Sequence, residues 1–440
     1  MTKVSPIGRS AVVITAARGL GLVASFLVTL LFTRILGSVE FGIYMVATAW
    51  ALMLAILAQL GMDRLLSREV AFLVDQRDPR SIRLMIWWSI GRVSLIAWPL
   101  AAIAFATFLL SPLAGSGHAR FAAALAMALI PISGYTAIIK GALSGFGRVA
   151  VAQALSDLFN PLVLLTLTVS GGLLWFEAGT GITAVGLAVS SAFVCAAIGA
   201  AILLFVCRRF DSQTISAGDA LPPRLLSKSL AFTWIAGMNA LLAHADIVMV
   251  GAFTDDATAG VYGLSSYLGS IGTALSVALG AATTPRLAVA FRKRQLAEAQ
   301  KISLAMALVT GVSTVLYLLF LLILGRHVLW VFGADFIAGW PAACVITAGY
   351  AIGSCCGPTG HLLNMAGKEA VTARSMVVAV AANIVLNLAL IPLLGILGAA
   401  LATGLVVVGR NIYLVWVIRR RVGIDPTILG LLWLRRGAGV

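Results

Sequence analysis

Three basic side chains fall inside apolar segments long enough to cross a membrane, and a fourth lies close to the cytoplasmic end of such a segment; all four could bind an anionic group. The three are Arg18, Arg92 and Arg410, and the fourth is Lys140. A charge at the bilayer centre costs about 2.5–3.5 kcal/mol, so such residues usually face a water-filled cavity. The planar guanidinium also suits paired hydrogen bonds to phosphate oxygens. We therefore interpret the four as candidate ligands of a phosphate-bearing substrate, together with Ser25 on the Arg18 face. For Arg18 and Arg92 the alternative is snorkelling to the interface, and Lys140 could be an ordinary cytoplasmic charge.

A stripe of polar residues marks one face of a later segment. Its members stand at i, i+3, i+4 and i+7, which is helical spacing: Gln153, Ser156, Asp157 and Asn160. Four polar residues on one face of a membrane helix rarely face lipid. The stripe therefore lines either a cavity or a hydrogen-bonded contact between helices, and in a cavity Asp157 would be a cation or proton site. Pro161 follows directly and predicts a kink there.

Two further faces carry polar groups. Asn239 and Asp246 are seven residues apart and share one face of a helix, whereas His244 points nearly the opposite way. Asn239 is a candidate substrate ligand. Asp246 is a candidate ligand for a coupling cation, with a structural ion pair as the alternative. Asn383 and Asn387 also share a face, where we expect contacts that hold helices together.

The chain shows no catalytic or metal-binding constellation. Its five cysteines lie in or beside apolar segments without the spacing of metal ligands, and no nucleophile stands near a general base. We therefore expect no catalytic residue, no metal site and no cofactor.

The composition indicates which solvent surrounds these residues. The chain is 61% hydrophobic and only 11% charged, whereas soluble proteins carry about a quarter charged residues. Its apolar runs are continuous rather than alternating, which excludes a β-barrel and predicts an all-α polytopic membrane protein. We expect twelve spans: 12–34, 42–62, 84–110, 120–143, 151–175, 182–206, 229–252, 260–284, 303–325, 340–364, 374–393 and 396–418.

The basic residues predict the orientation of these spans. Twenty-five of the 31 Lys and Arg residues fall on one side of the predicted membrane. Basic loops stay cytoplasmic, so both termini are predicted to be cytoplasmic. The net charge of +15 then reflects this topology and attraction to anionic lipid, and we expect no nucleic-acid partner.

A polar segment with two prolines divides the chain into halves of six spans each. We expect an N-terminal bundle over 1–210, a cytoplasmic linker over 211–226, a C-terminal bundle over 227–420 and a cytoplasmic tail over 421–440. The halves show weak internal similarity, as in FGIY at 41–44 and AGVY at 259–262. Parallel repeats of this kind place a pseudo-two-fold axis along the membrane normal and the substrate between the halves.

Several motifs resemble those of polysaccharide-transporter flippases. They are TRILG at 33–37 with FGIY, DIVMVG at 246–251 with GVY, and Asn387 ahead of Ile391-Pro392 and of GILGAA at 395–400. The chain thus resembles the polysaccharide branch of the multidrug/oligosaccharidyl-lipid/polysaccharide exporter superfamily, which includes O-antigen flippases. The resemblance implies a MATE-like fold, with two pseudo-symmetric six-helix bundles around a central cavity.

The resemblance also implies a function. Such proteins export a lipid-linked oligosaccharide, commonly linked to undecaprenyl diphosphate, across the bacterial inner membrane for O-antigen, capsule or exopolysaccharide synthesis. Its partners would be the substrate and membrane lipids. The polysaccharide polymerase machinery is a further candidate partner. A multidrug or cation antiporter of the same superfamily is an alternative, but few acidic residues lie in the spans. A glycan polymerase or acyltransferase is another, but the external loops are short.

Overall fold

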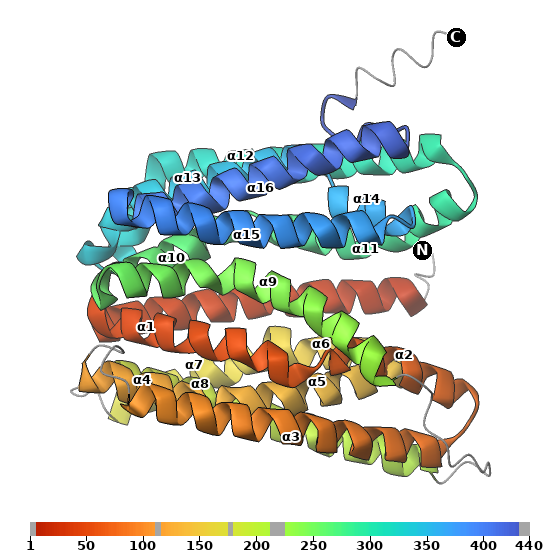
Figure 1. Ribbon diagram of the computed structural model, residues 1–440, viewed down its shortest axis with the longest axis horizontal. Helices are drawn as coiled ribbons and strands as arrows, with labels where there is room; N and C mark the ends of the chain where they lie inside the picture. The colour runs from red at the N-terminus through yellow and green to blue at the C-terminus, as the bar shows by residue number, and fades with distance from the viewer. Residues whose placement is uncertain (1–5, 111–115, 175–178, 212–224, 431–440) are drawn as a thin grey trace. The chain divides into compact units, whose positions relative to one another are not determined.

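The computed structural model describes residues 6–110, 116–174, 179–211 and 225–430, and helices account for nearly all of this part of the chain (Figure 1). No strand occurs among these residues, so the all-α prediction is confirmed. The elements in chain order are α1 Pro6–Gln59, α2 Met62–Asp75, α3 Pro79–Leu110, α4 Gly117–Ala126, α5 Leu129–Gly145, α6 Val149–Ala154, the π-helix η1 Leu155–Phe159, α7 Asn160–Leu174, α8 Gly181–Asp211, α9 Leu225–Phe253, α10 Asp256–Ile271, α11 Ala274–Arg292, α12 Leu296–Phe332, the 3-10 helix η2 Ala334–Gly339, α13 Trp340–Cys355, α14 Thr359–Met365, α15 Glu369–Leu394 and α16 Ile396–Arg421.

Ten helical segments of the described residues are long and apolar enough to cross a membrane, and two features explain the difference from the twelve predicted spans. Residues 17–75 form a single segment that covers most of the first predicted span and all of the second, because α1 breaks only at Gly37. The backbone there has φ 70° and ψ −176°, a conformation that essentially only glycine adopts. The predicted span 260–284 is divided at residues 272–273 into α10 and α11, and neither part is among the ten.

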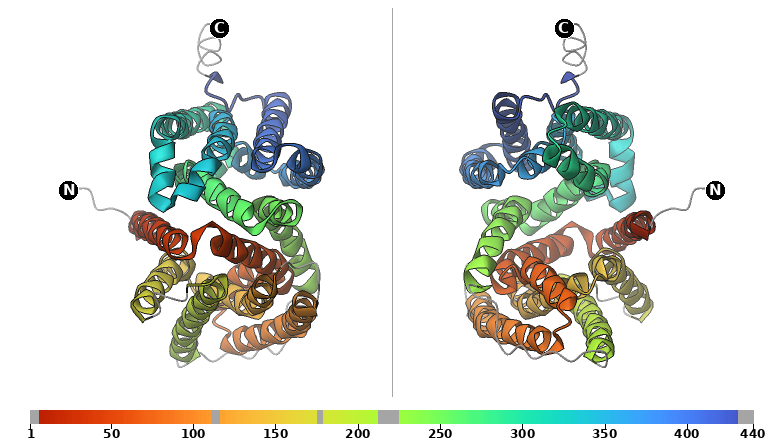
Figure 2. Two further views of the ribbon diagram at one scale, coloured as in Figure 1. Left: turned by 90° about the vertical axis from the view of Figure 1, so that its left-hand side faces the viewer. Right: turned by 90° about the vertical axis from the view of Figure 1, so that its right-hand side faces the viewer.

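The chain forms two compact units, residues 1–244 and 245–440, and the division falls inside α9. In the first unit α5 packs against α1, α2, α3 and α8, and Figure 2 views these helices nearly end-on. Small residues allow the close approach. A Cβ on Gly141 of α5 would lie 2.7 Å from the Met62 carbonyl oxygen of α2, so the contact depends on glycine, as is common where apolar solvent supplies little driving force.

The second unit is built around α12, α13, α15 and α16, which pack pairwise along their lengths. Gly349 of α13 faces Gly404 of α16, where an added Cβ would lie 2.7 Å from the Gly404 Cα. The two backbones therefore touch directly, and α16 is held against α13 without intervening side chains.

Residues 422–430, which follow α16, pack back onto the second unit. The Gln300 side chain of α12 pairs with the backbone of Asp425: Nε2 donates to the carbonyl oxygen at 2.6 Å, and Oε1 accepts from the amide nitrogen at 2.7 Å. Arg419 forms an ion pair with the Asp425 carboxylate at 2.8 Å. The Ile428 amide donates to the Cys355 carbonyl oxygen at 3.0 Å. Gln300 and Asp425 are both buried, so this segment belongs to the core of the unit.

Replacing Gln300 tests this contact. Gln300→Ala leaves the buried N–H and C=O groups of Asp425 without partners, at about 1–3 kcal/mol for each group. We expect a lower melting temperature of the detergent-solubilised full chain. Gln295→Ala, at an exposed position just before the same helix, is the control and should melt like the parent. Equal melting temperatures for the two variants would contradict the assignment.

Candidate functional site

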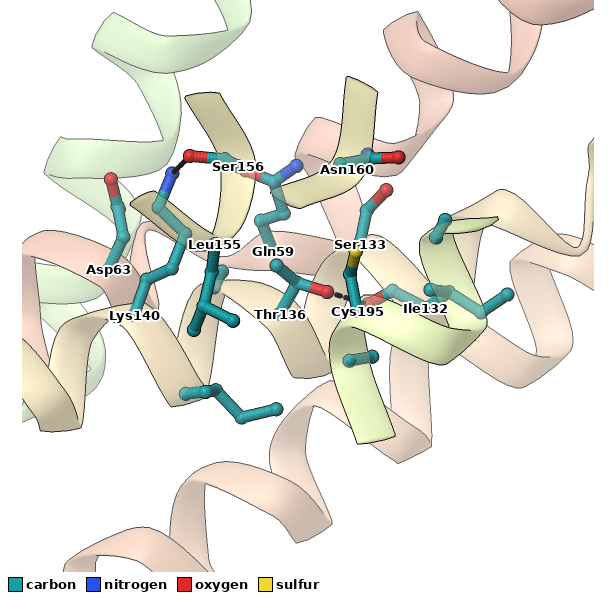
Figure 3. A pocket seen from close by; sticks show the side chains of 14 residues that line it. Gln59, Asp63, Ile132, Ser133, Thr136, Lys140, Leu155, Ser156, Asn160 and Cys195 are labelled. Atoms are coloured by element: carbon teal, nitrogen blue, oxygen red, sulfur yellow. Dashed lines mark hydrogen bonds between the residues drawn. The ribbon is translucent and has the colours of Figure 1, made fainter. Parts of the chain in front are cut away.

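A polar cavity of about 160 Å³ lies inside the first unit. It lies between α1, α2, α5, η1, α7 and α8, and Figure 3 shows its lining from close by. The polar residues that line it are Gln59, Asp63, Ser133, Thr136, Lys140, Ser156 and Asn160. A volume of this size has room for several waters or for one phosphate group.

A connected set of charged and polar groups begins at Lys140 of α5. Its Nζ donates to the Ser156 Oγ at 3.0 Å, and that hydroxyl in turn donates to the Asp157 Oδ1 at 3.1 Å (Figure 3 draws the first of these bonds). Arg18 of α1 places its Nε 4.0 Å from the Asp157 Oδ2. This is the outer limit of an ion pair, and the Arg18 side chain is 40% exposed. Its guanidinium therefore keeps donors available for an anion.

The π-helix η1 explains why this set forms. Pro161 lacks the N–H that would donate to the Asp157 carbonyl in an α-helix, and the chain at 155–159 widens to a π-turn with the Asn160 amide bonded to the Leu155 carbonyl. The Asp157 carbonyl oxygen packs against Gly21 of α1, one turn from Arg18. π-Turns are frequent at functional sites, and this one brings Asp157 and Arg18 together.

The widened turn spreads the predicted polar stripe over several neighbours. Ser156 faces Lys140 on α5, whereas Asn160 accepts a hydrogen bond from the Ser191 Oγ of α8 at 3.0 Å. Lys140 and Asn160 lie at opposite ends of the group drawn in Figure 3. Gln153 is half-buried and is not part of the cavity lining. The stripe thus serves both as cavity lining and as contact between helices.

The second unit buries one carboxylate among neutral polar groups. Asp246 of α9 is 5% exposed. It accepts hydrogen bonds from the Tyr262 hydroxyl of α10 at 3.1 Å, from the Asn387 Nδ2 of α15 at 2.8 Å and from the Thr403 hydroxyl of α16. The Asn387 Nδ2 also donates to the Asn383 Oδ1 at 3.1 Å. Four helices therefore meet at this carboxylate.

The charge of Asp246 has no counter-charge in the part of the chain that the structure describes, where no Lys, Arg or His forms an ion pair with it. The Asn387 Oδ1 is buried without a hydrogen-bond partner, and so is the Asn383 Nδ2. A buried charge is normally paired or bound to a cation. One carboxylate with nearby amide, hydroxyl and phenol oxygens is a donor set that suits a hard monovalent cation.

Several predicted residues lie outside these two clusters, among them Arg92, Ser25 and Asn239. Arg92 of α3 is exposed, and its guanidinium carbon lies 5.8 Å from the centroid of the Trp88 ring. Ser25 of α1 is half-buried and Asn239 of α9 is exposed, and neither lines the polar cavity. Their roles in substrate binding stay predictions.

Arg410 lies in the second unit, in a groove between α15 and α16. It is half-buried, and its Nε donates to the Ser375 Oγ at 3.4 Å. Groups of three or more His, Cys, Asp or Glu side chains that could hold a metal ion are absent from the described residues.

Sequence reasoning missed several members of these clusters. Gln59 and Asp63 line the cavity from either side of the break between α1 and α2, and no helical spacing links them to Lys140. Tyr262 and Thr403 reach Asp246 from other helices. The only available signal was polarity within an apolar segment, which does not show which helices meet.

Comparison with known proteins supports both the fold and a family. A sequence profile of the family described as "Polysaccharide biosynthesis protein" matches residues 7–291, more than half of the chain. A search of curated protein sequences finds no match.

Solved structures show the same fold at low sequence identity. An inward-facing multidrug resistance MATE family transporter of the MOP superfamily superposes with a TM-score of 0.69 at 13% identity, covering 94% of this chain and 98% of that one. The lipid II flippase MurJ in an inward closed conformation gives 0.68 at 15% identity, over 93% and 87%. A MOP superfamily transporter from Pyrococcus furiosus gives 0.63 at 14% identity, over 97% and 95%. The chain therefore has the fold of these transporters.

The contact between Gly21 and Asp157 provides a test of the site geometry. In Gly21→Ala the new Cβ would collide with the Asp157 carbonyl, so α1 and η1 must separate, at about 1–3 kcal/mol. We expect a lower melting temperature. Gly19→Ala, on the same helix with open space around its Cβ, should be neutral or slightly stabilising. If Gly21→Ala melts no lower than Gly19→Ala, the close approach does not exist.

Proposed function

Because the chain belongs to the family of polysaccharide biosynthesis proteins, we propose that it is a flippase that moves a lipid-linked oligosaccharide across a membrane. The family match over residues 7–291, on a chain with the fold of membrane transporters and of a lipid II flippase, is the observation that carries this proposal. The multi-pass chain is a membrane transporter. Undecaprenyl diphosphate as the lipid carrier, and O-antigen, capsule or exopolysaccharide as the product, are the finer parts of the proposal.

The polar cavity of the first unit is our candidate for contact with the diphosphate. The cavity is lined by Lys140, which supplies positive charge, and by Ser156 and Asn160, which supply hydrogen-bonding groups. Arg18 is not part of the lining, but its Nε lies 4.0 Å from the Oδ2 of Asp157, the residue next to Ser156. The cavity accommodates a phosphate-sized group. In this proposal the site holds the charged linkage of the substrate. Asp157 keeps the two cations in place when no anion is bound.

Asp246 is our candidate for ion coupling. Its carboxylate is buried among Tyr262, Asn387 and Thr403 without a basic partner in the described residues. A cation bound there would neutralise the carboxylate and satisfy the orphaned Asn387 Oδ1. Alternating access driven by a cation gradient is the mode of transport that this arrangement supports.

The same carboxylate favours one alternative function. A cation antiporter for drugs also requires a buried acidic group, and one of the structural relatives is a multidrug resistance transporter. The family match supports the flippase instead, since it is to polysaccharide biosynthesis proteins. We place the protein in the bacterial inner membrane with both termini cytoplasmic, as the basic loops predict, and the lipid-linked oligosaccharide is its proposed partner.

Neutralising the two cations of the first unit tests the substrate assignment. Arg18→Gln with Lys140→Gln removes two charge-assisted contacts, each of which contributes about 1.5–3 kcal/mol. We expect flipping to fall about a hundredfold or more, so the variant should not complement a flippase-deficient strain at normal protein level.

The matched control removes the same charge from exposed positions near the α2–α3 connection. Arg77→Gln with Arg80→Gln changes an exposed residue between α2 and α3 and an exposed residue in the first turn of α3, and should complement fully. Full complementation by both double variants would remove the polar cavity from the mechanism.

Sodium-dependent stability tests the Asp246 site. Sodium chloride should raise the melting temperature of the parent by about 2 °C or more over choline chloride at equal ionic strength, because a ligand stabilises the state that it binds. Asp246→Asn should abolish the difference. Asp255→Asn, at the exposed N-cap of α10, should keep it, since Asn caps a helix as well as Asp does. An equal sodium response in Asp246→Asn would contradict the site, as would no response in the parent.

A further inference from the structure

A groove of about 420 Å³ runs between α15 and α16 in the second unit. Its lining is apolar over most of its length and basic at one end. The apolar residues are Val378, Ala379, Ala382, Leu386, Leu405 and Val406, and the polar end holds Arg374, Ser375, Arg410 and Tyr413. A volume of this size is typical of small-molecule sites, and the division into an apolar and a cationic part suits an amphipathic anion.

The two arginines of this groove are not neutralised by the protein. Arg374 is exposed and has no ion pair among the described residues. Arg410 is half-buried, and its one hydrogen bond goes to the neutral Ser375 Oγ. Guanidinium groups bind phosphate oxygens bidentately. An apolar groove that ends in two uncompensated guanidinium groups therefore has a positive potential at that end alone.

The surroundings indicate the depth of this end in the bilayer. Tyr413 stacks on Trp416 with ring centroids 6.2 Å apart, and the Arg420 guanidinium carbon lies 4.5 Å from the centroid of the Trp416 ring. Tyrosine and tryptophan gather at the membrane–water interface, where headgroups lie. Helix α16 then ends in three consecutive arginines, residues 419–421. The basic end of the groove therefore lies at the headgroup level.

The apolar part of the groove has the length of one leaflet. Arg374 and Leu386 are twelve positions apart on α15, which is about 18 Å of helix at 1.5 Å per residue. Half of the hydrocarbon core of a bilayer is about 15 Å thick. An acyl chain that follows the groove from the arginines therefore reaches about the middle of the membrane.

We propose that this groove is a binding site for an anionic phospholipid of the surrounding membrane, with the phosphate between Arg374 and Arg410 and one acyl chain along the groove. This site is separate from the polar cavity of the first unit, and it assigns Arg410 to a structural lipid instead of the transported substrate. Basic pockets between membrane helices are known to bind anionic headgroups. The proposal does not depend on which substrate the protein carries.

Lipid retention measured by native mass spectrometry tests the proposal. The full chain in detergent is titrated with phosphatidylglycerol and, separately, with phosphatidylcholine of the same acyl chains. The parent should retain phosphatidylglycerol in preference, and Arg374→Ala with Arg410→Ala should reduce that preference about tenfold or more, since hydrogen bonds to charged groups are lost. Arg292→Ala with Arg421→Ala, two exposed arginines of the same unit, is the control and should retain the preference.

A second variant tests the apolar part without changing the charge. Ala382→Phe fills the middle of the groove and should lower phosphatidylglycerol retention with both arginines intact. Inorganic phosphate should not displace the lipid, because it cannot use the apolar part.

Four outcomes would overturn the proposal. The first is an equal preference for phosphatidylglycerol in the parent and in the groove double variant, and the second is an equal loss of that preference in the control. The third is displacement of the lipid by inorganic phosphate. The fourth is a groove variant that changes the oligomeric mass instead of the amount of retained lipid. Tighter binding of undecaprenyl phosphate than of phosphatidylglycerol would also overturn it, because the groove would then belong to the substrate.

Discussion

Lipid offers no hydrogen bonds, so a charge inside a membrane-spanning helix needs a partner within the protein or a ligand that brings one. This constraint organises both units of the chain. In the first, Lys140 and Arg18 are linked through Ser156 and Asp157. In the second, Asp246 is surrounded only by neutral donors within the described residues. The first arrangement has two cations and one carboxylate and is accessible to an anion, whereas the second has a carboxylate that a cation could neutralise.

Local backbone features make these arrangements possible. Pro161 removes one donor from a helix, η1 widens, and the freed carbonyl of Asp157 packs against Gly21. Pro161 and Gly21 thus determine how closely α1 and η1 approach each other. Gly37 acts in a similar way at larger scale, because its φ of 70° allows a single long helical segment to turn back as two spans.

Part of this architecture could be predicted from sequence, because the length of an apolar segment is set by consecutive residues and needs no knowledge of the neighbouring helices. Composition predicts the all-α membrane fold, and helical spacing predicts that Ser156, Asp157 and Asn160 act together. Spacing could not show that η1 would direct them to three different neighbours. It showed that Asn387 shares a face with Asn383, but not that this face meets Asp246. Contacts between distant helices depend on packing that no single helix encodes.

The most direct test of the proposed transport is the distribution of lipid-linked oligosaccharide between the two leaflets of a strain that lacks this protein. The account predicts that intermediates accumulate on the cytoplasmic leaflet and that surface polysaccharide is lost, with both effects reversed when the gene is restored. Intermediates that reach the outer leaflet normally, with unchanged surface polysaccharide, would contradict it.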